Sequence, residues 1–221
     1  MLFHDRTEAG QVLADRLTEY ANRADVLVLA LPRGGVPVAY EVARALHAPL
    51  DIFLVRKLGV PGHEELAMGA IASGGVRVLN EEVVRALGIP PETIASVAAG
   101  EQRELERRAQ TYRGDRPPLD VRNRTVILVD DGLATGSTMR AAVAALCRKG
   151  PDRVVVAVPV GSVETCAEFQ DVADETVCAR TPEPFYAVGR WYEDFTQTTD
   201  EEVHELMQRA AEEQAAVSQQ W

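Results

Sequence analysis

The chain has 221 residues, of which 46% are hydrophobic, and a formal net charge of −11 at pH 7. This length fits one α/β domain of generous size. The acidic balance argues against a nucleic-acid partner, because phosphate backbones are bound by a basic surface. No apolar run approaches the roughly 20 residues that cross a bilayer, and the N-terminus lacks the layout of a secretory signal. We therefore expect a cytoplasmic protein without membrane partners.

The spacing of apolar residues predicts the elements in chain order. Ala9, Val12, Leu13 and Leu17 line one face of a helix over 5–23, and the continuous run 26–31 is typical of a buried parallel strand. The same reasoning predicts, in order, a helix over 36–46, a strand over 51–56, two helices within 80–113, a strand over 125–130, a helix over 137–149, a strand over 154–160, a helix over 162–170 and an acidic helix over 199–219.

Strands that alternate with helices predict an open, mainly parallel sheet flanked by helices. Residues 57–75 are rich in glycine, proline and charge, which predicts a mobile loop followed by a hairpin around Ser73–Gly75. Residues 181–198 are irregular and aromatic, which indicates a small cap. The three cysteines, Cys147, Cys166 and Cys178, lack the spacing of a metal site and the density of a disulfide scaffold, so we expect buried free thiols.

The run VILVDDGLATGSTM (126–139) joins a strand, an acidic pair and a loop that opens a helix. A ligand of a parallel sheet binds beyond the carboxyl ends of its strands, and a helix N-terminus favours phosphate. Thr135, Gly136, Ser137 and Thr138 therefore indicate a phosphate loop. Asp130 and Asp131 suit sugar hydroxyls or a metal. The alternative is an ordinary capped helix.

This run resembles the signature of the type I phosphoribosyltransferase family. The resemblance implies that Asp130 and Asp131 meet the ribose hydroxyls of phosphoribosyl pyrophosphate (PRPP) and help to place Mg²⁺, while residues 135–138 hold its 5′-phosphate. In the family's 6-oxopurine branch an acidic residue stands near the middle of the signature, where this chain has Ala134. That departure weakens a hypoxanthine or guanine assignment.

Two further segments resemble parts of the family's active site. Arg33, Gly34 and Gly35 correspond to its pyrophosphate loop, which often contains a cis peptide, here expected near Arg33-Gly34; the alternative is a routine strand-to-helix turn. Arg56 and Lys57 begin a stretch (about 57–70) similar to the family's flexible loop. Its cations would neutralise the leaving pyrophosphate. His63 and Glu64, or Glu65, would transfer a proton, unless this stretch is only a solvated loop.

Residues 181–198 resemble the hood that holds the base in purine members. Tyr186 would stack on the ring and Glu193 would accept a hydrogen bond from it; the alternative is an aromatic mini-core that anchors the C-terminus. The resemblance implies a Mg²⁺-dependent, homodimeric enzyme of nucleotide salvage. This enzyme would transfer the phosphoribosyl group of PRPP to a nitrogenous base, with a purine favoured. A non-catalytic PRPP or nucleotide sensor, and a phosphotransferase or hydrolase that acts on a phosphorylated sugar, are the other hypotheses.

Overall fold

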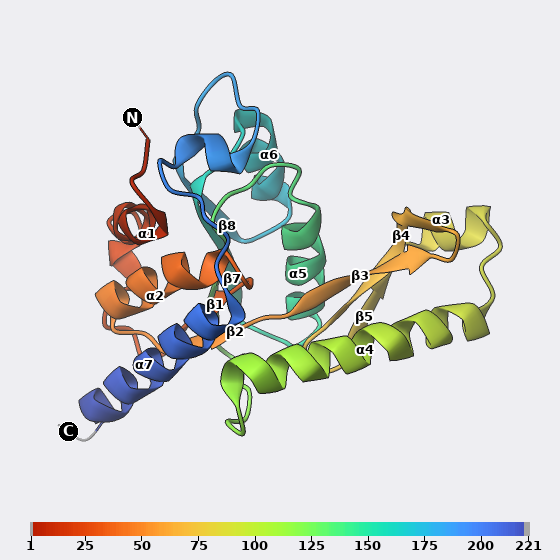
Figure 1. The fold of residues 1–221 in the computed structure, drawn as a ribbon, viewed down its shortest axis with the longest axis horizontal. Helices are drawn as coiled ribbons and strands as arrows, with labels where there is room; N and C mark the ends of the chain where they lie inside the picture. The colour runs from red at the N-terminus through yellow and green to blue at the C-terminus, as the bar shows by residue number, and fades with distance from the viewer. Residues whose placement is uncertain (1, 219–221) are drawn as a thin grey trace.

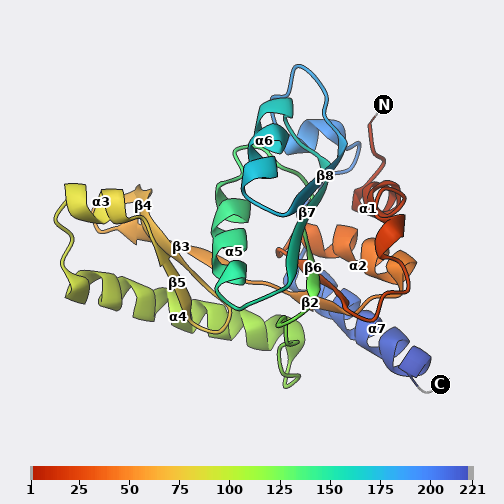
Figure 2. The same cartoon turned by 180° about the vertical axis from the view of Figure 1, so that it is seen from behind.

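The computed structural model describes residues 2–218 and contains a five-stranded parallel sheet in the order β2-β1-β6-β7-β8. Helices cover both faces of this sheet, as Figures 1 and 2 show. This arrangement confirms the predicted fold class. The strands are β1 (Val26–Ala30), β2 (Leu50–Ile52), β3 (Val55–Val60), β4 (His63–Ala72), β5 (Val76–Leu79), β6 (Thr125–Val129), β7 (Arg153–Val160) and β8 (Glu175–Arg180).

The α-helices are α1 (Arg6–Ala14), α2 (Gly35–Leu46), α3 (Glu81–Ala86), α4 (Pro91–Arg113), α5 (Ser137–Cys147), α6 (Val163–Glu168) and α7 (Asp200–Ser218). Three short 3-10 turns lie at Thr18–Tyr20, Phe169–Asp171 and Val188–Trp191. The first predicted helix is therefore shorter than 5–23. Residue 219 of the last predicted helix lies outside the described part of the chain. Within residues 2–218, no helix is both long and apolar enough to span a membrane.

Alternation along the central strands divides the core into two layers. Val26, Val28 and Ala30 of β1 face α2, whereas Leu27 and Leu29 face the opposite core with α5. Side chains of successive strand residues point to opposite faces of a sheet, so a strand that is buried on both faces is apolar throughout. The continuous apolar runs in the sequence reflect this burial.

Residues 55–113 form an arm that projects from the side of the parallel sheet (Figure 1). Its strands make a separate antiparallel sheet in the order β3-β4-β5, and this sheet contacts α4 and α5. The predicted strand over 51–56 is thus divided at Phe53 and Leu54 between the two sheets. The segment 57–70, predicted as a mobile loop, is instead paired from Val55↔Ala72 to Val60↔His63 as a β-hairpin. The hairpin predicted around Ser73–Gly75 is confirmed, because these residues join the paired strands β4 and β5.

The cysteine prediction was also wrong. Cys166 and Cys178 form a disulfide that ties α6 to β8, and Cys147 is an exposed free thiol. The strand β8 was missed because ETVCAR (175–180) has few apolar residues. Every residue of this edge strand is only half-buried, so its sequence lacks the apolar run that identified the central strands.

Candidate active site

Two loops meet at the carboxyl ends of the neighbouring strands β1 and β6: a glycine loop (residues 31–35) and an acid–threonine loop (residues 130–138). A Cβ atom on Gly34 would lie 2.0 Å from Asp131 Oδ2, and one on Gly35 would lie 2.8 Å from the carbonyl oxygen of Val129. Only glycine allows this approach. The structure therefore brings the predicted Gly34 and Gly35 against the predicted acidic pair. The cis peptide is Pro32-Arg33, one bond before the predicted position.

Asp130 and Asp131 form a partly buried acidic pair. Burial and the adjacent Asp131 carboxylate raise the pKa of Asp130 well above its ordinary value. Burial also raises the pKa of Asp131, although the charge of Arg6 acts in the opposite direction. A divalent cation would favour the charged form of both carboxylates.

The donor chemistry of this pair fits Mg²⁺. No group of three or more His, Cys, Asp or Glu side chains suited to a metal gathers within the described residues. However, Mg²⁺ is commonly bound by one or two carboxylates together with substrate phosphates. In this structure Asp130 Oδ1 accepts a hydrogen bond from the Asp131 amide at 2.9 Å, and no cationic side chain is paired with Asp130 among residues 2–218.

Arg6 and Tyr192 both donate hydrogen bonds to Asp131, and the sequence analysis predicted neither as a site residue. Arg6 Nε donates to Asp131 Oδ2 at 2.9 Å, and Arg6 Nη1 donates to the carbonyl oxygen of Thr196 at 2.8 Å. Tyr192 donates its hydroxyl proton to the carbonyl oxygen of Asp131 at 2.6 Å. No motif marks Arg6, because its partner lies 125 positions away in the chain. Arg6 thus fixes the orientation of the Asp131 carboxylate, whereas Asp130 Oδ2 is available to bind a ligand or a metal ion.

The acid–threonine loop presents its polar groups outward. Thr135, Ser137 and Thr138 are exposed, and no side chain caps the start of α5. Gly136 has φ +69°, and a Cβ atom there would lie 2.5 Å from Phe169 Cε2. Thr165 of α6 supports this loop, because its Oγ1 donates to the carbonyl oxygen of Ala134 at 2.7 Å. An open helix N-terminus on a rigid support is suited to bind a phosphate.

The hood (residues 181–198) packs on the N-terminal segment. The Phe3 amide donates to the Trp191 carbonyl and the Glu193 amide donates to the Phe3 carbonyl, each at 2.8 Å. Phe3 and Tyr192 lie in a small core with Ala9 and Val160. Glu193 pairs with His4 Nδ1 at 3.1 Å, and Tyr186 is 76% exposed. The hood is thus anchored by an aromatic core, and its stacking role remains a prediction.

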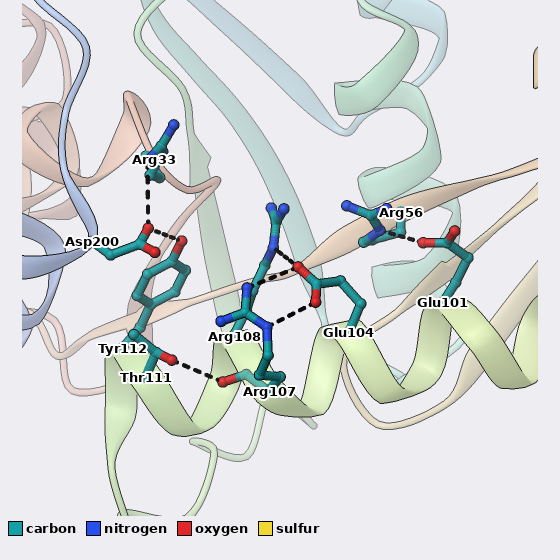
Figure 3. A network of polar contacts seen from close by, with 9 residues as sticks. All are labelled: Arg33, Arg56, Glu101, Glu104, Arg107, Arg108, Thr111, Tyr112 and Asp200. Carbon is teal, nitrogen blue, oxygen red and sulfur yellow. Dashed lines mark hydrogen bonds and ion pairs between the residues drawn. The ribbon is translucent and has the colours of Figure 1, made fainter.

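Of the other predicted residues, Arg33 lies in the glycine loop, and the rest lie on the arm (residues 55–113). Arg33 Nη1 lies 3.5 Å from Asp200 Oδ1, to which Tyr112 also donates (Figure 3). Arg56 pairs with Glu101 of α4, and Lys57 is exposed on β3. His63 and Glu64 begin β4, at the far end of the hairpin, which Figure 1 shows beside α3. The structure therefore does not bring His63 and Glu64 to the acidic pair.

Comparison with known proteins identifies the family of this chain. The family model described as a phosphoribosyl transferase domain matches residues 5–179. Two curated proteins from two strains of Mycobacterium tuberculosis, named provisionally as phosphoribosyl transferases, are each 49% identical over 209 residues. The match covers 95% of this chain and 47% of each relative, so the chain spans about half their length.

Among solved structures, the protein TT1426 from Thermus thermophilus is 44% identical, with a TM-score of 0.84 over 95% of this chain and 99% of that one. A protein from Chloroflexus aurantiacus named bifunctional protein PyrR is 32% identical over 129 residues, which cover 57% of this chain and 65% of that protein. The signature run at 126–139 lies inside the segment that the family model matches. This chain belongs to the phosphoribosyl transferase domain family.

Proposed function

We propose that this chain transfers the 5-phosphoribosyl group of PRPP to a nitrogenous base and releases pyrophosphate. One observation carries the proposal: the carboxylate pair that begins the acid–threonine loop lies against the glycine loop, at the carboxyl ends of neighbouring strands, and both loops are suited to bind phosphate. The family membership and the provisional names of the M. tuberculosis relatives support it. A purine is the acceptor that we favour, because residues 181–198 resemble the hood of purine members; the exposed ring of Tyr186 there offers a stacking surface.

In this proposal each loop holds one end of PRPP. Residues 135–138 bind the 5′-phosphate, Asp130 and Asp131 meet the ribose hydroxyls, and Arg33, Gly34 and Gly35 bind the pyrophosphate. Mg²⁺ held by the two aspartates, when bound, would neutralise charge on the phosphates. Displacement at C1′ passes through an oxocarbenium-like transition state, so the residues act by positioning and by stabilising the leaving group.

The proposal also requires that the β3–β4 hairpin of the arm close over the carboxyl ends of β1 and β6. Arg56 and Lys57 would then supply positive charge to the departing pyrophosphate, and His63 and Glu64 would transfer a proton. Glu193, now paired with His4, would hydrogen-bond the base after exchanging that partner. A homodimeric, cytoplasmic enzyme of nucleotide salvage is part of the same proposal.

The test is turnover with PRPP, Mg²⁺ and a panel of purines, pyrimidines and related heterocycles, with pyrophosphate release as the signal. The proposal expects release with at least one base, loss of release after chelation of Mg²⁺, and recovery when Mg²⁺ is restored. No release with any base would contradict the transferase function. Binding of PRPP without turnover would instead support a sensor, and release of orthophosphate would support a hydrolase.

A further inference from the structure

A stripe of polar side chains runs along the face of α4 that is turned toward the two sheets. Glu101, Glu104, Arg108 and Tyr112 are spaced three or four residues apart, so they lie on one face of the helix. At one end Glu101 pairs with Arg56 of β3; at the other, Tyr112 donates to Asp200 Oδ1 at 2.7 Å. The stripe therefore links the arm to the glycine loop through Asp200 and Arg33.

Arg108 holds an unusual place in this stripe. Its Nε donates to Glu104 Oε1 at 2.7 Å, and no other hydrogen-bond partner of its guanidinium lies within residues 2–218. In Figure 3 this guanidinium rises from α4 between Arg33 and Arg56. The single bond to Glu104 orients the group and leaves both terminal nitrogens available to a ligand.

The positive charges of Arg33 and Arg108 both affect the pKa of the Tyr112 hydroxyl. Burial and the hydrogen bond to Asp200 raise the pKa of Tyr112 to about 12, and the positive charges of Arg108 and Arg33 both act in the opposite direction. Tyr112 is one helical turn from Arg108 and shares Asp200 with Arg33. The Arg33 and Arg108 guanidiniums thus lie on either side of the Tyr112 hydroxyl (Figure 3), each near enough to affect its pKa, in a chain whose net charge is −11.

We propose that Arg108 binds the diphosphate group of the substrate together with Arg33. This inference rests on the proposed function, and it adds a residue from a helix in which the sequence predicted no site residue. A guanidinium presents paired N–H donors that match phosphate oxygens, and such charge-assisted bonds are stronger than neutral ones. In the absence of the ligand, Arg108 donates to Glu104 and Arg33 lies beside Asp200, and the diphosphate would add bonds to the donors that these contacts leave unused.

The neighbouring Arg107 provides a matched control. It pairs with the same carboxylate, but through two bonds, from Nε at 2.8 Å and Nη2 at 3.0 Å. Its side chain is 59% exposed, compared with 36% for Arg108. Replacing either arginine removes one charge and one partner of Glu104. Only Arg108 is expected to touch the ligand.

The experiment is calorimetric titration of inorganic pyrophosphate and of PRPP, each with Mg²⁺, into the wild-type chain and the variants Arg108→Ala, Arg108→Lys and Arg107→Ala. We expect Arg108→Ala to raise the Kd for pyrophosphate about tenfold or more, as expected when a hydrogen bond to a charged group is lost. Arg107→Ala should change it less than about twofold, and Arg108→Lys should fall between, because lysine keeps the charge without the paired donors. Thermal denaturation checks that all variants fold.

The outcomes separate this inference from the proposed function. Equal Kd values for Arg108→Ala and Arg107→Ala, in a chain that still releases pyrophosphate from PRPP, would overturn the role of Arg108 alone. Dependence of pyrophosphate binding on Arg108 without turnover of any base would support the inference while the transferase function fails. A wild-type chain that binds neither pyrophosphate nor PRPP would overturn both.

Discussion

The carboxyl edge of the parallel sheet and the arm hold their ionisable groups in different ways. At the edge, Asp130 and Asp131 are partly buried and their pKa values are raised. Along the arm, the side chains of Arg56 and Arg108 are about one-third exposed (32% and 36%), and each is paired with an acid of α4. A buried carboxylate pair needs a cationic partner to become fully charged, whereas ion pairs that solvent reaches exchange partners at a lower cost. The edge is thus suited to fix a ligand, and the arm to supply charge to it.

The junction between the two regions should show the largest effect. Arg113 of α4 donates from Nε to Asp51 Oδ1 of β2 at 2.8 Å, and both side chains are buried. Arg113→Met should lower the free energy of unfolding by about 3–5 kcal/mol, because it leaves a buried carboxylate without its cation. Denaturant unfolding measures this. As a control, Arg122→Ala breaks an exposed pair with Asp120 and should cost less than about 1 kcal/mol. Equal losses would show that the junction is no special anchor.

The acidic pair should control turnover rather than stability. Asp130→Asn keeps the shape of the side chain but removes a charge that the proposed Mg²⁺–PRPP complex requires. We expect pyrophosphate release to fall about 10²–10³-fold, the range typical of removing one electrostatic contact in an active site. Steady-state kinetics and a thermal melt test this together. An unchanged rate would refute the role of Asp130.

Loss of the hydrogen bond by which the hood supports Asp131 should have a smaller effect than loss of the Asp130 charge. Tyr192→Phe removes the donor to the Asp131 carbonyl and should lower the free energy of unfolding by about 1 kcal/mol. Denaturant unfolding of this variant beside Tyr186→Phe, whose hydroxyl is on an exposed side chain, gives the comparison. If the two variants were equally stable, the hydrogen bond from Tyr192 would contribute nothing to the site.

The hairpin end should show the smallest effect. His63→Ala and Glu64→Gln alter exposed residues that, in the proposed function, would reach the site only after closure of the hairpin. We expect each single variant to lower kcat less than about tenfold, below the roughly 10²-fold typical of a positioned general acid or base, because the other residue is still present to transfer the proton; the Kd for PRPP should not change. A larger loss of kcat would show that closure places these groups as firmly as the edge places Asp130.

Much of the edge was predictable because it is built from contiguous units. The strand, the acidic pair and the loop at 126–139 follow one another in sequence, and β1, its glycine loop and α2 repeat the order of strand, loop and helix. The carboxyl ends of neighbouring parallel strands lie at one edge of the sheet, so local patterns were enough to bring Gly34, Gly35 and the acids together.

The remaining features depend on contacts between distant parts of the chain. Arg6 reaches Asp131, and Cys166 pairs with Cys178, without any local pattern that announces them. The segment 57–70 has the glycine and charge of a loop, but pairing with its own second half and packing against α4 and α5 order it as β3 and β4. In this segment, strand pairing and tertiary packing overrode the local composition.

The most direct test of PRPP binding at the carboxyl edge is calorimetric titration of PRPP with Mg²⁺ into the wild-type chain and the Asp130→Asn variant. We predict saturable binding with one PRPP per chain for the wild type, and binding weakened at least about tenfold in the variant, as expected when a charged partner is lost. Equal affinity in the two proteins, or no binding to the wild type, would contradict the placement of PRPP at the carboxyl edge.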